Sequence, residues 1–468
     1  MGANVLQDML IGLGVIGGFL LLGALLRAVV PLFRKWLLPA SVIGGTIGLL
    51  LGPGIWGAKA PLPFPAPWME FWAALPVVLI VPIFAAAPLG MFMSPAKKGR
   101  ALRDVAPMVL LMTGLFALGG SIQHIAGFGI NLAITAVRPE TDLYRTFGWE
   151  LPKGFSGGHG TATSIGSILR DFGIDYWQTS QGIGLTMATV GLIGGMILGI
   201  FFINRAARRG ETKLIAKKGQ ISEELQRGYT KDVDRQKSLG RETTVGSSIE
   251  TITVHIALLF AASALAYVLA RHMRVWVPQL FLPVWFYGLL IMYVINFILL
   301  KSKLNWLIDT KVKSRITGTL SDFAITAAIM TMPIKTVSAY AIPIAIMCVV
   351  GFVLTYYVTF PLFKKAFGDD FAFERAIMSW GANTGVMITG MTLLRITDPD
   401  YESPVMNDFS MGFGLIGILS IFISPIDYNF IARGSTAANF WWNIGLGAFY
   451  AVLGGIGYVL LRRRRAAS

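Results

Sequence analysis

The sequence predicts an all-α polytopic membrane protein with two inverted five-span repeats, each carrying a re-entrant hairpin, and an extra C-terminal span. Three observations support this fold class. Only 14% of the 468 residues are charged, against about 25% in soluble domains, and 54% are hydrophobic. Apolar stretches of membrane-spanning length recur along the whole chain. Two glycine-rich motifs lie at matching places in its two halves.

Eleven apolar segments are long enough to cross a bilayer core of about 30 Å, which takes about 20 helical residues. These segments are 8–30, 37–57, 71–93, 105–136, 178–204, 250–271, 276–300, 316–335, 338–363, 407–424 and 436–461. The fourth segment is long for one span and contains Gly119 and Gly120 near its middle. We therefore expect it to be broken or strongly tilted.

The net charge of +15 is compatible with nucleic-acid binding or with basic cytoplasmic loops. Thirty of the 40 basic residues fall in six regions, which are 27–35, 97–103, 205–241, 301–315, 364–375 and 462–465. With an outside N-terminus and alternating spans, all six lie on one side, which the positive-inside tendency identifies as the cytoplasm. We expect a multi-pass protein of the inner (plasma) membrane with a cytoplasmic linker and C-terminus. Nucleic acid is then not needed to explain the charge.

One long polar stretch, 205–249, predicts a cytoplasmic linker that is partly disordered or forms a short surface helix. It separates an N-terminal repeat, 1–204, from a C-terminal repeat, 250–435. The remaining residues, 436–468, form a C-terminal span and a basic tail.

An internal repeat connects the two halves. Segments 156–170 and 381–395 align at a constant offset of 225, each between the fourth and fifth span of its half. The aligned pairs include Gly160 with Gly385 and Arg170 with Arg395. The expected topology places the two motifs in opposite orientations. Inverted repeats with glycine-interrupted short segments are typical of secondary transporters.

The stretches that lead into the motifs are too charged to span lipid, so we expect re-entrant hairpins near 145–170 and 370–395. Glycine lets a ligand approach the backbone closely, and the start of a helix offers free N–H groups that suit a carboxylate. The alternative is that the glycines only permit tight helix packing. The candidate substrate-binding residues at the tips are Ser156, Gly157, Gly158, His159, Gly160, Thr161, Thr163, Asn383, Thr384 and Gly385.

Charged residues near the hairpins and spans are further candidates. Arg170 and Arg395 end the hairpins and would suit a substrate carboxylate, or they reach an interface or pair with Asp171 or Asp398. Three residues are candidates for holding a cation such as Na⁺: Asp322, Asp427 and Asn429. For Asp322 the alternative is an interior pair with a basic residue, and for the other two it is an exposed loop turn.

The sequence contains no recognisable set of catalytic residues. The four histidines have no transition-metal spacing, no Walker-type phosphate loop occurs, and nothing indicates an organic cofactor. An ion gradient is the remaining common source of energy.

The motifs at 156–162 and 381–386, with those at 41–53 and 318–322, resemble the bacterial sodium/glutamate symporter family over most of the chain. The resemblance implies a homodimeric carrier that takes up L-glutamate, or a similar small carboxylate, with Na⁺. It also implies an elevator-type movement of a transport domain against a dimerising scaffold. By motif, Asn383 would join the substrate and ion site. The alternatives are a carrier of another organic anion, a carrier driven by H⁺, and, from a different class, a passive channel.

Overall fold

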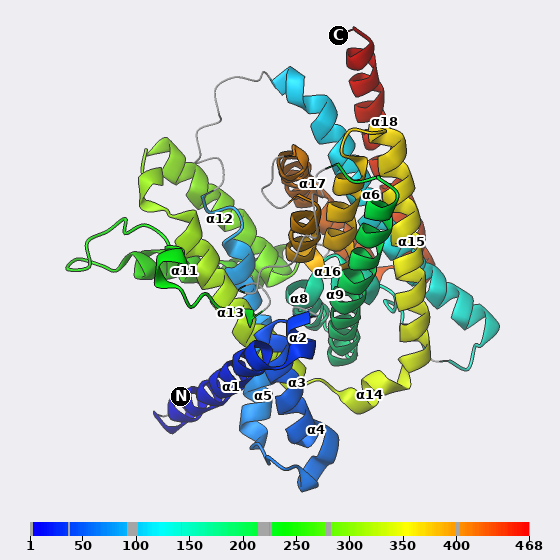
Figure 1. Ribbon diagram of the computed structural model, residues 1–468. Coiled ribbons are helices and arrows are strands. Elements are labelled where there is room, and N and C mark those ends of the chain that lie inside the picture. Colours follow the sequence, from blue (N-terminus) through cyan, green and yellow to red (C-terminus); the bar gives the residue numbers. More distant parts are fainter. Residues whose placement is uncertain are drawn as a thin grey trace. The chain divides into compact units, whose positions relative to one another are not determined.

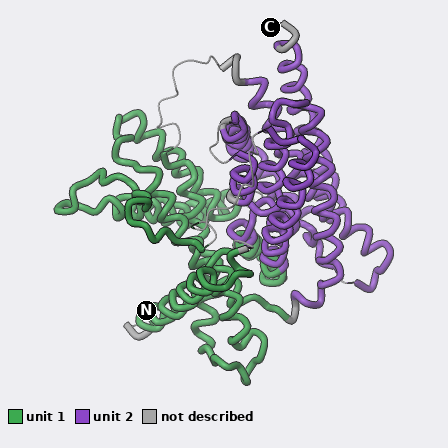
Figure 2. Tube along the Cα trace, viewed as in Figure 1, with its two compact units in different colours: residues 1–98, 163–182, 223–335 green, residues 99–162, 183–222, 336–468 purple. Residues whose placement is uncertain are grey.

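The structure is a computed structural model that describes residues 3–35, 38–90, 102–141, 143–213, 224, 227–277, 282–398 and 403–467. In these residues the regular elements are helices, and none is a strand (Figure 1). The chain divides into two compact units (Figure 2). Unit 1 comprises residues 1–98, 163–182 and 223–335, and unit 2 comprises residues 99–162, 183–222 and 336–468. Each unit therefore takes segments from both halves of the chain.

Unit 1 contains two groups of helices, one from each half. They are α1 (Ala3–Val29), α2 (Pro31–Lys35), α3 (Ala40–Leu51), α4 (Pro53–Trp56), η1 (Gly57–Lys59) and α5 (Ala66–Ala85), then η2 (Val233–Arg235), α11 (Thr251–Trp276), α12 (Val284–Lys301), η3 (Asn305–Leu307) and α13 (Thr310–Met330). Glycines set the distance between α1 and α3. A Cβ on Gly23 would lie 2.1 Å from the carbonyl oxygen of Ala40, and one on Gly44 equally close to that of Phe19. Only glycine permits such an approach of two backbones.

Unit 2 holds the longest helices of the described chain. Its elements are α6 (Leu102–Val137), α7 (Glu150–Phe155), most of α9 (Trp177–Arg208), α15 (Ala341–Phe367), α16 (Ala372–Thr397), α17 (Val405–Arg433) and α18 (Thr436–Ala467). Helix α8 (Gly158–Asp171) begins in unit 2 and ends in unit 1, and α14 (Ile334–Ala339) starts at the end of unit 1.

Helices α6 and α18 pack along each other through small residues. A Cβ on Gly114 would lie 2.3 Å from the Cα of Gly454, and one on Gly457 would lie 2.4 Å from the backbone nitrogen of Leu111. Helix α6 runs unbroken for 36 residues, so of the two expected alternatives, a break at Gly119 and Gly120 or a strong tilt, the break is absent. Its length leaves tilt as the way to fit a bilayer of about 30 Å.

Ten of the described helices are long and apolar enough to cross a membrane, against the eleven expected segments. The missing one is 316–335, which forms most of α13. That helix carries Lys311, Lys313 and Arg315 in its first turns and Asp322 at its middle, and these charges shorten its apolar stretch. The chain is thus a multi-pass helical membrane protein, and its last helix is one of the ten. Residues 91–101 and 214–223, which hold part of the predicted cytoplasmic charge, lie outside the described residues.

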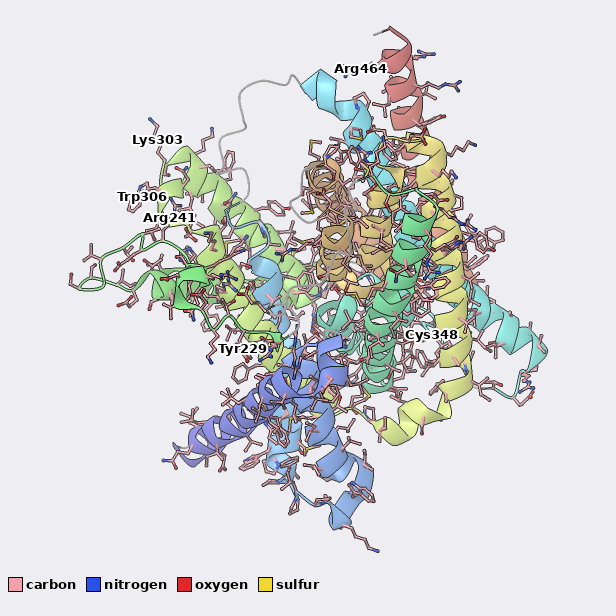
Figure 3. The ribbon with its side chains drawn as sticks, in the orientation of Figure 1. Tyr229, Arg241, Lys303, Trp306, Cys348 and Arg464 are labelled. Carbon is pink, nitrogen blue, oxygen red and sulfur yellow. The ribbon has the colours of Figure 1, made fainter. Side chains whose placement is uncertain are left out.

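The linker is divided between the two units: residues 205–213 belong to unit 2 and include the end of α9, whereas residues 227–249 belong to unit 1, where they are largely irregular and include the short turn η2. Arg241, labelled in Figure 3, donates to the carboxylate of Asp309 over 2.9 Å. Asp309 also caps α13 by accepting from the N–H of Lys311, and its own N–H donates to Nε2 of His255. Burial raises the pKa of Asp309, but the guanidinium of Arg241 and the cap hydrogen bonds outweigh it and hold this pKa below its usual value.

The glycine contact between α6 and α18 predicts a position-specific effect on stability. Gly457→Ala should lower the free energy of unfolding by about 1–3 kcal/mol, because the new methyl group meets the α6 backbone. Gly455→Ala is the matched control, since a Cβ there has no atom within 4 Å. Thermal unfolding of both variants tests this, and equal losses would contradict the packing described here.

The docking of the linker predicts a pH-dependent effect. Arg241→Gln should reduce hydrogen-exchange protection of residues 240–252 at neutral pH by about 0.2–1 kcal/mol. The folded-state pKa of Asp309 lies below its unfolded value of about 3.9, so this stabilisation is present above that pH and is lost as the pH falls through the folded pKa. Wild type and variant should therefore converge in acid.

Arg235→Gln serves as the control for this experiment, because the ion pairs of Arg235 within the described residues are with the exposed Asp232 and Glu224. It should leave protection of residues 240–252 unchanged at both pH values. A difference between Arg241→Gln and wild type that persists in acid would rule out the ion pair as its cause.

Candidate functional site

The first predicted hairpin contains a break between two helices. Helix α7 ends at Phe155, and α8 begins at Gly158, whose φ is +64°. A Cβ on Gly158 would also lie 2.2 Å from Cγ1 of Val386. Both its backbone conformation and this contact require glycine at the tip.

The second predicted hairpin contains a similar break within α16. Gly385 and Val386 leave the helical conformation, with φ values of −144° and +66°. A positive φ is rare for a β-branched residue and marks local strain, which is often found at functional sites. The two positive-φ residues, Gly158 and Val386, are 228 positions apart, and they touch. The two tips therefore meet within unit 2. Their separation of 228 positions is three more than the offset of 225 at which the two motifs align.

Gln123 on α6 connects the two tips. Its Oε1 accepts from the hydroxyl of Ser156 over 2.9 Å, and its Nε2 donates to the carbonyl of Asn383 over 2.7 Å. The same amide donates to the hydroxyl of Thr355 on α15 over 2.9 Å. Ser156 in addition donates to the carbonyl oxygen and to Oδ1 of Asn383, each over 3.3 Å. We call Ser156, Gln123, Asn383 and Thr355 the tip network.

The helix break explains why the tip network forms. A carbonyl in the last turn before a break loses its partner four residues on, and lipid offers no replacement. The carbonyl of Asn383 lies in that turn and accepts from Gln123 and Ser156 instead. The carbonyl of Gly385 accepts from the hydroxyl of Thr389.

Glycines on α9 let the helix with the second tip approach closely. Gly191, Gly195 and Gly199 recur at four-residue intervals, and a Cβ on any of them would lie within 2.5 Å of Thr384 or Leu393. The indole of Trp380 donates to the carbonyl of Gly195 over 2.9 Å. Thr384 is fully buried here, and its hydroxyl donates to its own helix at Trp380.

The first turn of α8 has one occupied and one open side. The buried ring of His159 is bonded through Nε2 to the hydroxyl of Thr189 over 3.0 Å, and that hydroxyl donates to the carbonyl of Leu185. A Cβ on Gly160 would have no atom within 4 Å. The half-buried Thr161 follows. Open space therefore borders the N-terminal turn of this helix at Gly160, and such a turn favours anions.

Lys153 on α7 adds a charged group that is not among the candidate residues of the sequence analysis. Its Nζ lies 5.0 Å from the ring centre of Trp149 and 6.0 Å from that of Tyr428. The opposite charge on this side is Asp427, which accepts from the indole of Trp442 over 3.3 Å. The first hairpin thus carries a cation inside unit 2.

Two ion candidates, Asp427 and Asn429, lie inside α17 and not in a loop turn, because the helix continues past Pro425 to Arg433. Asn429 donates to the carbonyl of Pro425 over 2.8 Å. Asp322 is exposed on α13 in unit 1. Of the four ion candidates, the tip network contains Asn383. No group of three or more acidic, histidine or cysteine side chains converges in the described part of the chain.

The later residues of the first hairpin lie away from its tip. Thr163 is buried, and its carbonyl accepts from Gln181 over 3.0 Å. Arg170 is exposed twelve residues after Gly158, about 18 Å along the same helix, and its guanidinium lies 5.8 Å from the ring centre of Trp177. Asp171, its suggested partner, pairs with Arg274 over 3.4 Å.

Arg395 is likewise exposed near the end of α16, and the carboxylate of Asp398 accepts from Ser403. Sequence reasoning missed Gln123 and Thr355. The available signal was a glutamine three residues after Gly120, within a predicted membrane span.

A family model described as "Sodium/glutamate symporter" matches residues 7–392, which is most of the chain and includes both tips. No curated protein matches the sequence.

The tip network predicts that the amide of Gln123 stabilises the fold. Gln123→Leu keeps the size of the side chain but leaves the buried Asn383 carbonyl and Thr355 hydroxyl short of a partner. We expect the free energy of unfolding to fall by about 1–3 kcal/mol in thermal or chemical denaturation. Thr135→Val, which removes an exposed hydroxyl from the same helix, should cost less, and an equal cost would contradict the role given to Gln123.

Proposed function

The chain belongs to the sodium/glutamate symporter family, and we propose that it takes up L-glutamate, or a similar small carboxylate, together with Na⁺. The family is one of membrane transporters that use Na⁺ as the coupling ion. The observation that carries the proposal is the tip network, in which Gln123 bonds both broken hairpins at once. Ligand binding at either tip would then change the hydrogen bonds of the other tip through Gln123.

Each part of the site suits one part of the cargo. The carbonyl of Asn383 and the hydroxyls of Ser156 and Thr355 are oxygen ligands of the kind that hard cations prefer. The open side of Gly160, at the first turn of α8, suits a substrate carboxylate. Na⁺ bound at the carbonyl would displace a hydrogen bond of Gln123 and so change the tips that hold the substrate.

The division of the chain supports an elevator-type mechanism. Both tips belong to unit 2, so we assign the transport domain to unit 2 and the dimerising scaffold to unit 1. Two helix breaks at corresponding places in the halves support inverted repeats with re-entrant hairpins. We further propose a homodimer in the inner membrane with the N-terminus outside and the C-terminus in the cytoplasm. Termini on opposite sides require an odd number of crossings, so in this proposal α13 crosses the membrane in addition to the ten apolar helices. Labelling of single cysteines at the two ends in intact cells tests this orientation.

Uptake into proteoliposomes tests the proposed function. An inward Na⁺ gradient should drive accumulation of radiolabelled L-glutamate above equilibrium, because each charge moved down 100 mV supplies about 2.3 kcal/mol. A panel of amino acids and other organic anions, with Na⁺ or H⁺ gradients, identifies the substrate and the ion. Flux that neither saturates nor depends on a gradient would indicate a channel, and no Na⁺-dependent accumulation of any substrate would refute the proposal.

Substitutions at the tips should separate transport from folding. Gly160→Val fills the open side of α8, and Gly385→Leu meets Thr389, whose hydroxyl would lie 2.6 Å from the new Cβ. Both should abolish uptake while membrane insertion and dimer formation persist. Gly417→Val is the matched control, because it also enters open space in unit 2 but lies outside the tips. Normal uptake by both tip variants would remove the hairpins from the mechanism.

A further inference from the structure

A cavity of about 530 Å³ lies in unit 2 among the ends of α9, α15 and α16. Its volume falls within the range of about 300–1,000 Å³ that is usual for ligand sites. Four of its lining side chains are cationic and three are anionic: Arg205, Arg209, Lys213 and Lys364, and Glu211, Asp369 and Glu374. We call it the α9–α16 cavity. No residue of the tip network lines it, and it does not depend on the proposed function.

The charged side chains around the cavity do not neutralise one another through ion pairs in the part of the chain that the structure describes. Among the described residues, none of the seven forms an ion pair within 4.0 Å. Glu374 is the clearest case, since it is fully buried and its Oε1 accepts from the backbone N–H of Lys213 over 2.8 Å. Its Oε2 has no hydrogen-bond partner in the part of the chain described. A buried carboxylate oxygen in this state favours a ligand that can donate.

The remaining wall is aromatic. Phe202, Tyr356 and Phe360 form a cluster with ring centres 5.0–5.1 Å apart, and Phe373 lies 5.8 Å from Phe360. Helices α9 and α15 are both long and apolar enough to span a membrane, and the cationic residues follow directly at their C-terminal ends. A cavity with one aromatic and one charged wall at this level fits a molecule that is itself apolar at one end and charged at the other.

We propose that the α9–α16 cavity binds the headgroup of an aminophospholipid, with its phosphate among Arg205, Arg209 and Lys364 and its ammonium at Glu374. The presence of both signs of charge selects this class. A purely anionic headgroup would satisfy the cations but place negative charge next to Glu374. A choline headgroup has the phosphate but no N–H to donate to the unpartnered oxygen. The first lipid carbons lie along the aromatic cluster.

Lipid-dependent thermal unfolding of the purified, delipidated full-length protein tests the proposal. Phosphatidylethanolamine should raise the melting temperature at concentrations about tenfold lower than phosphatidylcholine or phosphatidylglycerol with the same acyl chains, because those two lack the charged donor. Equal effects of the three lipids would overturn it. Glycerophosphoethanolamine, which lacks the chains, should be much weaker. If it acts as well as the lipid, the occupant is a soluble aminophosphate and the lipid assignment is wrong.

Two adjacent lysines provide a matched pair of variants. Lys364 and Lys365 are both exposed in the last turn of α15, but only Lys364 lines the cavity. Lys364→Gln should weaken the effect of phosphatidylethanolamine about tenfold, whereas Lys365→Gln should leave it unchanged. Glu374→Gln should remove the preference for phosphatidylethanolamine over phosphatidylcholine. Equal behaviour of the two lysine variants would overturn the proposal, and because both residues are exposed, that comparison remains valid if Glu374→Gln fails to fold.

Discussion

A helix that breaks inside a membrane leaves carbonyl groups without partners, and no water is present to replace them. In this chain that constraint falls on the carbonyl of Asn383, one turn before the break in α16. The amide of Gln123 supplies the missing donor from a helix 260 positions earlier, and Ser156 supplies a second. The partners come from α6 and from the first hairpin, so satisfying one backbone group brings the two halves of the chain together.

Backbone contact is the second requirement of this arrangement. Three glycines of α9 allow α16 to lie closely against it, and Gly158 allows the first tip to touch Val386. Side chains at these positions would separate the helices by more than a hydrogen bond can bridge. The packing explanation for glycine and the ligand explanation are therefore not alternatives for the molecule as a whole. Gly158 and Gly191 serve packing, whereas Gly160 borders open space.

Sequence reasoning predicted the parts of the fold that depend on local composition. It placed ten of the membrane-spanning helices and the C-terminal one among them, and the family it suggested is confirmed. Glycines suggested a break that α6 does not have, and the charges of α13 leave segment 316–335 outside the ten apolar helices. Sequence reasoning singled out Ser156 and Asn383 by their motifs, and both residues belong to the tip network. Gln123 and Lys153 were missed because their importance depends on which distant helices surround them, and a single sequence does not contain that information.

The contact between α6 and α18 has a consequence for the order in which the protein is made. Gly114 and Gly454 are 340 positions apart, and α18 lies beyond the residues that the family model matches. The helices from α1 to α17 are synthesised and inserted before α18 emerges from the ribosome. Until then the glycine face of α6 is without its partner, so unit 2 completes its packing only after α18 has been made. Loss of α18 would then leave a folding intermediate, with an uncovered backbone surface open to quality-control proteases.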